Sequence, residues 1–304
     1  MIEIELLGKK WKNPTVLASG VLSTTLESLE RIAEEGAGAV TTKSLTLEPR
    51  SGHPGPNIIE VECGLLNAMG YPNPGIEEGI KEFSNWKREE PLILSITGKN
   101  VEEFGLLAEK IEQTRFAPSA IEAAISCPHT PGYGLMADQT GPDFVEKVVN
   151  KIKEKTKIPL IIKLSPSAPG EVAAAKAAER AGADAINMGN TIGPGMKIDI
   201  ERKKPILGFG RGGLSGPAIK PITMRCVYDI YEAVGIPIIA TGGVVSGEDA
   251  IEYIMAGATA IGVGSGIYYR TTKVFKKISL EMKRWLHDHG YKKIEEIKGI
   301  AHER

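Results

Sequence analysis

Cysteine and histidine are scarce in this sequence of 304 residues. The three cysteines, Cys63, Cys127 and Cys226, form neither a CxxC pair nor a disulfide-rich pattern, which indicates a reducing compartment. Among the five histidines, His287 and His289 have no matching cysteine or carboxylate cluster at the spacing of a metal site. We therefore expect no structural metal.

The chain also lacks a dominant charge and a long apolar run. Its 37 lysines and arginines against 38 aspartates and glutamates leave a net charge of −1, so it has no basic field of the kind that nucleic-acid binding requires. No apolar run approaches the ~18 residues that span a bilayer, and residues 1–5 alternate charged and apolar side chains, unlike a signal peptide. We expect a cytoplasmic protein that contacts neither nucleic acid nor membrane.

Short apolar or β-branched runs alternate with stretches of helical spacing along the whole chain. The expected strands are residues 15–20, 39–44, 92–97, 120–126, 159–165, 185–191, 236–243 and 260–266. The expected helices are residues 27–35, 101–114, 143–156, 171–181, 224–234, 248–256 and 274–289. Strands that are each followed by a helix predict an α/β fold, a (β/α)₈ TIM barrel.

A recurring phrase favours one domain over two. The sequences EGAGA at 35–39, RAGAD at 180–184 and AGATA at 256–260 precede the second, sixth and eighth strands. Each ends a helix with glycine and re-enters the sheet. We expect residues 1–304 to form a single domain.

Two segments depart from a minimal barrel. Residues 2–11, with a Gly8-Lys9-Lys10 turn, predict a small hairpin that could plug the barrel floor. Residues 46–76 form a long insertion, rich in glycine and proline, between a strand and its helix. Loops of this length are usually functional, and in barrels function lies at the carboxyl ends of the strands.

Polar residues gather at those strand ends. A buried lysine needs an anionic or electron-rich partner. Lys43 or Lys163 alone could form a structural ion pair, but two lysines on one rim favour an anionic ligand. The other strand ends carry hydroxyl, amide or glycine residues, namely Ser19, Gly20, Ser44, Ser95, Asn190, Thr191, Gly242, Gly243, Gly264 and Ser265.

The turns after strands seven and eight suggest a bound phosphate. Gly242-Gly243 and Gly264-Ser265 occupy the position where barrels often bind phosphate through backbone N–H groups. Because no standard side chain accepts a hydride well, redox chemistry here would require a cofactor. A phosphate site and a lysine on the rim suit flavin mononucleotide (FMN).

Cys127 follows the apolar run 120–125 and opens a loop with the sequence SCPHTPGYG. An isolated cysteine is more often a buried structural residue. At a strand end it can instead accept a proton, provided that its surroundings favour the thiolate. We expect Cys127 to be the base that removes a carbon-bound proton while a flavin takes hydride from the adjacent carbon.

The chain resembles the class 1 dihydroorotate dehydrogenases over essentially its whole length. Motifs in matching order carry the resemblance: Asn13-Pro14 with Ala18-Ser19-Gly20, Thr42-Lys43-Ser44-Leu45-Thr46, Asn67-Ala68-Met69-Gly70, Ile125-Ser126-Cys127-Pro128, Ile162-Lys163-Leu164-Ser165-Pro166, Asn190-Thr191, Gly212-Gly213-Leu214-Ser215-Gly216-Pro217 and Thr241-Gly242-Gly243. The resemblance implies oxidation of (S)-dihydroorotate to orotate in pyrimidine (UMP) biosynthesis, with FMN as first electron acceptor.

The same resemblance implies roles for individual residues. Cys127 would be the catalytic base, and residues 128–139 a lid that excludes water during the transfer. The substrate would be bound by Lys43, which could neutralise its carboxylate, and by Asn67, Ala68, Met69, Gly70, Tyr71, Asn190 and Thr191. The cofactor would be bound by Ser19, Lys43, Ser44, Lys163, Gly189, Gly216, Gly242, Gly243, Gly264 and Ser265.

Three positions depart from the family pattern. Ala124 stands where most members carry an asparagine that touches both flavin and substrate. His129 stands in place of a frequent asparagine, and Ser95 in place of another asparagine of the B subtype. Losing one buried amide contact costs roughly 1–3 kcal/mol, which FMN binding can survive.

The motifs KLSP at 163–166 and GNT at 189–191 resemble the B subtype, which works with an iron–sulfur flavoprotein carrying FAD and passes electrons to NAD. This chain has no cysteine cluster for an iron–sulfur centre and no GxGxxG after a strand. The resemblance therefore implies a homodimeric core joined to an iron–sulfur/FAD electron-transfer subunit, as a heterotetramer. A fumarate-reducing enzyme stays open as an alternative.

Other functions also stay open. Ala124 leaves room for a related FMN barrel enzyme that acts on another cyclic amide or pyrimidine base. A flavin electron-relay subunit would need neither Cys127 nor a lid. A barrel without flavin that binds a phosphorylated sugar would leave Lys43, Lys163 and Asn67 without a shared purpose.

Overall fold

Eight parallel strands form a closed barrel in the computed structural model, which describes residues 1–125, 132 and 140–303. Each strand pairs with the next along the chain, and the last pairs with the first. The barrel strands are β3 (Thr15–Leu17), β4 (Ala39–Thr41), β7 (Leu92–Ile96), β8 (Ala120–Ala124), β9 (Leu160–Leu164), β10 (Ala185–Met188), β15 (Ile238–Thr241) and β16 (Ala260–Val263). The predicted TIM barrel is confirmed, with strands shorter than expected.

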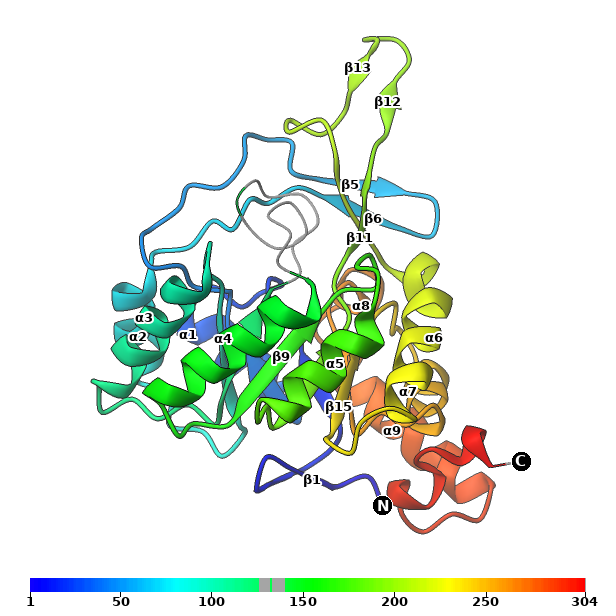
Figure 1. Cartoon of the computed structure of the whole chain (residues 1–304). Helices are drawn as coiled ribbons and strands as arrows, with labels where there is room; N and C mark the ends of the chain where they lie inside the picture. Colours follow the sequence, from blue (N-terminus) through cyan, green and yellow to red (C-terminus); the bar gives the residue numbers. More distant parts are fainter. Residues whose placement is uncertain (126–131, 133–139, 304) are drawn as a thin grey trace.

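Helices surround this barrel (Figure 1). They are α1 (Leu26–Glu34), α2 (Ile76–Phe83), α3 (Val101–Glu112), α4 (Pro142–Lys155), α5 (Glu171–Arg180), α6 (Lys220–Tyr231), α7 (Gly247–Met255), α8 (Gly266–Arg270) and α9 (Val274–Asp288), with 3₁₀ turns η2 (Pro217–Ile219), η3 (Ile294–Ile297) and η4 (Ile300–His302). The seven expected helices are present. Two helices were not predicted: α2, which has no side-chain N-cap, and α8, which has only five residues.

Glycine ends three of the helices in the way that the repeated phrase predicts. Gly36, Gly182 and Gly257 follow α1, α5 and α7 with φ angles of +101°, +97° and +107°. At the first of them, the N–H of Gly36 donates to the carbonyl of Ala33, and the N–H of Ala37 to that of Ile32. These turns satisfy the last carbonyls of the helix and direct the chain into the next strand.

The predicted N-terminal hairpin is also present. Strands β1 (Ile4–Leu6) and β2 (Lys9–Trp11) pair antiparallel, with Ile4 opposite Trp11. Their inward side chains are buried in the main core. Figure 1 shows this hairpin at one end of the barrel, close to the N-terminus.

A second sheet lies at the opposite end. Strands β5 (Ile58–Val61) and β6 (Gly64–Asn67) come from the connection after β4, and β11 (Ile192–Gly195) and β14 (Gly212–Ser215) from the connection after β10. They form an antiparallel sheet in the order β11-β14-β6-β5. A two-stranded arm, β12 (Ile198–Asp199) and β13 (Lys204–Pro205), projects beyond it (Figure 1). The insertion at 46–76 therefore contains a hairpin that the sequence analysis expected only as a loop.

In the described part of the chain, none of the helices combines the length and the apolar character that crossing a bilayer demands.

Candidate active site

Two adjoining cavities lie at the carboxyl ends of the barrel strands, beneath the antiparallel sheet. The larger has a volume of about 710 Å³ and the smaller about 130 Å³. The larger falls in the range of cavities that hold small molecules and cofactors. The residues that line both cavities, and so form the wall between them, are Ser19, Gly20, Val21, Asn67, Met69, Lys163, Asn190 and Thr191.

Charged and amide side chains contribute to the lining of the small cavity. Lys43 and Lys163 supply two ammonium groups, and Asn67 and Asn190 supply amides. Its remaining lining residues are Ser19, Gly20, Val21, Ser44, Met69, Gly70, Tyr71, Ala124 and Thr191. This set brings together every predicted substrate-binding residue except Ala68, which is fully buried and packs with Leu66 and Leu207 instead.

The large cavity collects most of the predicted cofactor residues. They are Ser19, Lys163, Gly189, Gly216, Gly242, Gly243, Gly264 and Ser265. Lys43 and Ser44, which were predicted for the cofactor as well, line only the small cavity. The grouping follows the topology, because the turns after β15 and β16 meet the end of β14 on one side of the barrel mouth.

Glycine is required where backbones meet at this mouth. Gly189 has a φ angle of +138°, and a Cβ there would lie 1.6 Å from the carbonyl oxygen of Thr241. Gly243 has a φ angle of +69°, and a Cβ there would lie 2.8 Å from the carbonyl oxygen of Gly216. Glycine at these two positions therefore lets neighbouring backbone segments pack closely, and both residues line the large cavity.

At Gly264 the absence of a side chain leaves space in the large cavity and does not relieve a backbone clash. A Cβ at this position would stand 3.6 Å from Ala18 and 3.9 Å from Val21, in ordinary contact. Both neighbours line the large cavity, so a side chain at Gly264 would take up cavity space. The volume and this cradle of glycines fit a flavin mononucleotide.

A buried polar network lies beneath the wall between the cavities. Its centre is Glu122 of β8, whose side chain is 1% exposed and accepts a hydrogen bond from the ammonium of Lys163 at 3.4 Å. Ser95 of β7 donates to the same carboxylate oxygen at 3.2 Å, and its hydroxyl lies 2.9 Å from that of Ser44. Ser95 therefore bonds within the barrel and lines neither cavity. Glu122 was not predicted as a site residue, although a charged residue inside the apolar run 120–125 is a visible signal.

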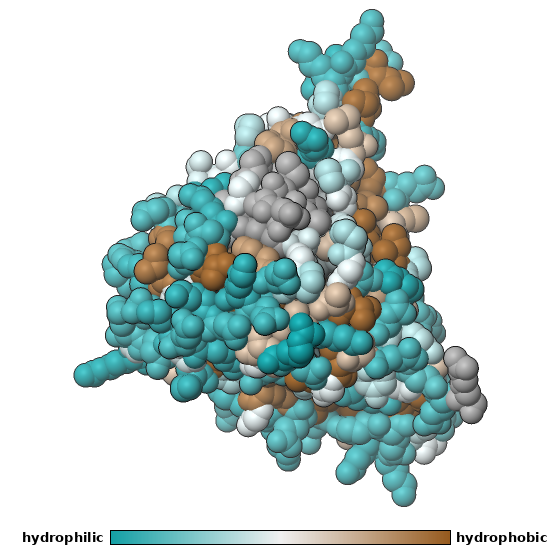
Figure 2. Space-filling view, viewed as in Figure 1, coloured by the Kyte–Doolittle hydropathy of each residue, from teal (hydrophilic) through white to brown (hydrophobic). Residues whose placement is uncertain are grey.

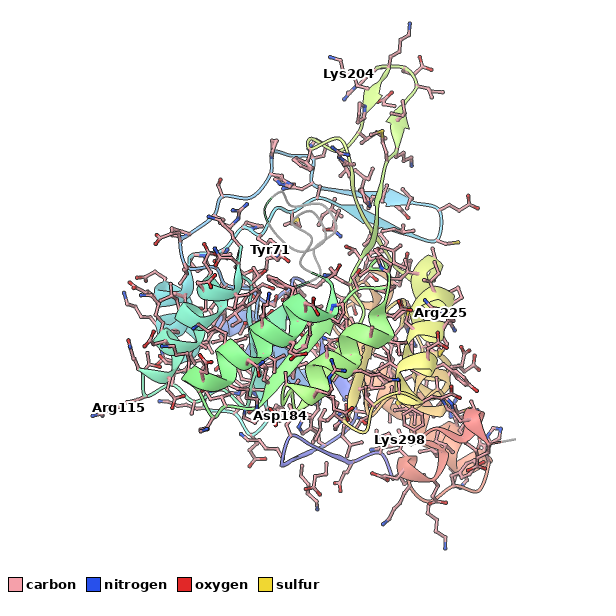
Figure 3. All side chains as sticks on the ribbon, viewed as in Figure 1. Tyr71, Arg115, Asp184, Lys204, Arg225 and Lys298 are labelled. Atoms are coloured by element: carbon pink, nitrogen blue, oxygen red, sulfur yellow. The ribbon has the colours of Figure 1, made fainter. Side chains whose placement is uncertain are left out.

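The loop that carries Asn67 to Tyr71 is held by residues that the sequence analysis also missed. Tyr71 adopts a φ angle of +57°, and its carbonyl accepts a hydrogen bond from the amide of Asn73 at 2.8 Å. The backbone N–H of His53 donates to the carbonyl of Met69 at 3.0 Å, and its ring stacks on Phe209 at 3.8 Å. Burial lowers the pKa of His53 below its ordinary value. Figure 3 shows Tyr71 on the side of the molecule that carries β5 and β6, away from Arg115 and Asp184.

Cys127, His129 and the expected lid, apart from Gly132, lie outside the described residues. Ala124, at the end of β8, is described and lines the small cavity. Its carbonyl accepts a hydrogen bond from the hydroxyl of Thr97 at 2.8 Å. The space that an asparagine side chain would fill at this position is therefore part of the small cavity.

Comparison with known proteins agrees with this architecture. The family model for dihydroorotate dehydrogenase matches residues 1–286. The catalytic subunit of dihydroorotate dehydrogenase B (NAD(+)) from Pyrococcus abyssi is 44% identical over 301 residues, which is 99% of this chain and 99% of that protein. The protein of the same name from Methanocaldococcus jannaschii is 46% identical over 308 residues, covering 100% of this chain and 99% of that protein.

A solved structure shares the fold at lower sequence similarity. It is the crystal structure of DHODH from Eimeria tenella in complex with ferulenol, with a TM-score of 0.85 and 21% identity. The match covers 100% of this chain and 89% of that one, and at this identity it concerns the fold alone.

Proposed function

This chain belongs to the dihydroorotate dehydrogenase family, and on that premise we propose that it oxidises (S)-dihydroorotate to orotate in pyrimidine biosynthesis, with FMN as the first electron acceptor. Enzymes of this family use a flavin. The observation that carries the proposal is the pair of adjoining cavities, which share Lys163, Asn67 and Asn190. One is small and lined in part by lysine and amide side chains, and the other is large enough for a flavin.

The small cavity suits dihydroorotate. The substrate is a compact ring that carries one carboxylate and several amide groups, and about 130 Å³ is a volume of that scale. Lys43 would neutralise the carboxylate, while the amides of Asn67 and Asn190 would pair with polar groups of the ring. Met69, Gly70, Tyr71 and Thr191 would enclose it.

The large cavity suits FMN. Gly216, Gly242, Gly243 and Gly264 all line this cavity, where their backbone N–H groups would meet a phosphate. The missing side chain of Gly264 also leaves space for a flat ring. Lys163 would present its ammonium to the flavin from the wall that the cavities share, with Ser19 and Ser265 as further contacts. Ser44 would contribute from the small-cavity side.

The reaction removes a proton from one ring carbon and a hydride from the adjacent carbon. The electron pair left by the proton forms the new carbon–carbon double bond as the hydride departs. A bound flavin supplies the hydride acceptor. Cys127, outside the described residues, would take the proton as its thiolate, and Lys43 would keep the ring in place while it does so.

Purified protein tests this proposal directly. We expect a yellow protein that releases FMN on denaturation, and a shift of the flavin absorbance when orotate is added. Uracil, which lacks the carboxylate that Lys43 would bind, should shift the spectrum only at much higher concentration. A protein without flavin would contradict the proposal, and an equal response to uracil would favour the alternative that Ala124 leaves open, an enzyme for another pyrimidine base.

A second subunit is part of the proposal. The relatives are named catalytic subunits of an NAD(+) enzyme, which implies a partner. We propose a homodimeric core with an iron–sulfur/FAD electron-transfer subunit. We also propose that the protein is cytoplasmic and that residues 1–304 form one domain.

Leu22, Ile58 and Tyr268 line the large cavity and are 46%, 55% and 54% exposed, so an apolar rim surrounds its mouth. Figure 2 shows further apolar surface on the projecting arm and below it.

Co-expression with a candidate iron–sulfur flavoprotein tests the partner. We expect co-elution in size-exclusion chromatography and NAD reduction by dihydroorotate. Leu22→Asp and Tyr268→Asp should weaken both. Leu280→Asp, at an equally exposed residue of α9, should change neither. A dimer that stays alone and reduces fumarate would contradict the partner.

A further inference from the structure

Glu122 is a carboxylate inside the barrel that the proposed chemistry does not use. It lies in the middle of β8, with its side chain 1% exposed, and it lines neither cavity. Burial of a charge is costly unless the charge is paired and hydrogen-bonded. A carboxylate at this position therefore requires a cationic or hydrogen-bonding partner.

Both carboxylate oxygens of Glu122 are engaged. Oε1 accepts hydrogen bonds from the ammonium of Lys163 at 3.4 Å and from the hydroxyl of Ser95 at 3.2 Å. Oε2 accepts from the amide of Asn187 at 2.6 Å. The pairing of the strands sets this geometry, because Ser95 lies opposite Glu122 on β7 and Asn187 lies opposite Lys163 on β10.

These contacts continue to the walls of both cavities. Asn187 accepts a hydrogen bond from the hydroxyl of Thr241 at 2.8 Å, and Thr241 lines the large cavity. Ser95 lies 2.9 Å from Ser44, whose hydroxyl lies 3.3 Å from that of Ser19, in the wall between the cavities. Glu122 is thus the hub of a network that ends on the surfaces where ligands would lie.

We propose that Glu122 is a positioning residue that fixes the ammonium of Lys163 at the wall between the cavities and offsets part of its positive charge toward a bound flavin. The inference rests on the proposed flavin site. Lysine has a flexible side chain, so a fixed anion on its inner side decides where the ammonium stays. The negative charge behind Lys163 also lowers the positive potential in front of it.

Through its charge beside Lys163, Glu122 helps to set the midpoint potential of the bound flavin. Negative charge develops on the flavin ring as it gains two electrons, and Lys163 stabilises that charge. The negative charge of Glu122 weakens this stabilisation of the reduced flavin. Glu122→Gln keeps the shape and an acceptor oxygen for Ser95, but removes the negative charge, so the midpoint potential should rise.

The expected size is a tenfold or larger gain in the affinity for reduced over oxidised flavin, which corresponds to about 30 mV for a two-electron couple. Lys163→Gln should shift the potential in the opposite direction. Glu122→Asp, which keeps the charge, should stay close to the parent potential. The potential is measured by redox titration of the bound flavin against reference dyes, without any turnover.

Glu90→Gln is the matched control. Glu90 is a largely buried glutamate, 12% exposed, that pairs with Lys12 at 2.6 Å and Arg88 at 3.1 Å just before β7, at the other end of the barrel. Its replacement should reduce stability and leave the midpoint potential unchanged. A shift of equal size in this control would overturn the assignment of the effect to Glu122.

The double variant keeps the test decisive if Glu122→Gln leaves Lys163 unpaired and does not fold. Glu122→Gln with Lys163→Gln removes both charges together, and its potential should lie above that of Lys163→Gln alone. Equal potentials in these two variants, or in the parent and a folded Glu122→Gln, would overturn the inference. A parent protein that holds no flavin would instead overturn the proposed function, so the two failures are distinguishable.

Discussion

A substitution at Gly264 tests flavin binding separately from folding. Its backbone is not in the left-handed region, and a side chain there would point among cavity residues without a close clash. We expect Gly264→Val to fold normally and to lose flavin, because its methyl groups occupy the cavity. The measurement is flavin content per protein together with the melting temperature.

Gly235→Val is the control, since Gly235 is exposed and lies between α6 and β15 at the amino end of the strand. It should keep its flavin. A Gly264→Val protein with full flavin content would contradict the position given to the cofactor.

Replacement of Cys127 gives a second prediction for a single residue. As a general base, a thiolate gives a rate that falls when pH drops below the thiol pKa, and a serine hydroxyl is a much poorer base. We expect Cys127→Ser to be active mainly at higher pH, and Cys127→Ala to reduce its flavin with dihydroorotate at least ~100-fold more slowly near pH 7. An undiminished rate in Cys127→Ala would refute the role of the thiol.

Residues at the strand ends could be predicted as site residues because a barrel brings the carboxyl ends of its strands together. Lys43, Lys163 and the glycines after β15 and β16 all line the cavities. Glu122 was not predicted, because its importance depends on Ser95, Lys163 and Asn187 from three other strands. The roles of the cavity-lining residues stay predictions.

At the scale of elements, the N-terminus of α7 secures the turn that follows β15. Asp249 accepts hydrogen bonds from the backbone N–H groups of Val245 and Ser246, both at 2.9 Å, and from Lys220 at 2.6 Å. The N–H of Asp249 in turn donates to the hydroxyl oxygen of Ser246 at 3.2 Å, which completes a capping box. This box fixes residues directly beside the glycine cradle.

Asp249 should contribute stability that depends on pH. Burial acts to raise its pKa, but the bonds from Lys220 and the backbone bring the pKa below its ordinary value. A lowered pKa adds stability above the unfolded value near 3.9, and this stability is lost as pH falls through the folded pKa. We expect Asp249→Asn to reduce the free energy of unfolding by about 1–3 kcal/mol at pH 7, and by less at pH 3.

Denaturant unfolding at both pH values measures this difference. The exposed neighbour Glu248 gives the control, and Glu248→Gln should change stability little. An Asp249→Asn deficit of the same size at pH 7 and pH 3 would argue against the charge as its source.

The elements of the barrel were readable from local sequence, since buried parallel strands are continuous apolar runs and the helices between them are periodic. The antiparallel sheet was not. Strand β6 pairs with β14, with Leu66 opposite Leu214, and no local pattern reports a pairing across that separation. The hairpin at 58–67 was therefore expected as a loop.

At the scale of the whole molecule, the barrel supplies a rigid floor and the antiparallel sheet a roof, with both cavities between them. Their shared wall contains Lys163, which Glu122 supports from inside the barrel. In the proposed function, this arrangement would hold a small anionic substrate and a large flat cofactor side by side. The proposed hydride transfer depends on the two cavities being adjacent.

Anaerobic mixing of the purified flavoprotein with dihydroorotate tests the adjacency most directly. The flavin absorbance and the amount of orotate are followed in the same sample, with no external acceptor. The account predicts that the flavin is bleached and that one orotate forms for each flavin reduced. A flavin that stays oxidised in the presence of dihydroorotate, while a chemical reductant still bleaches it, would contradict the account.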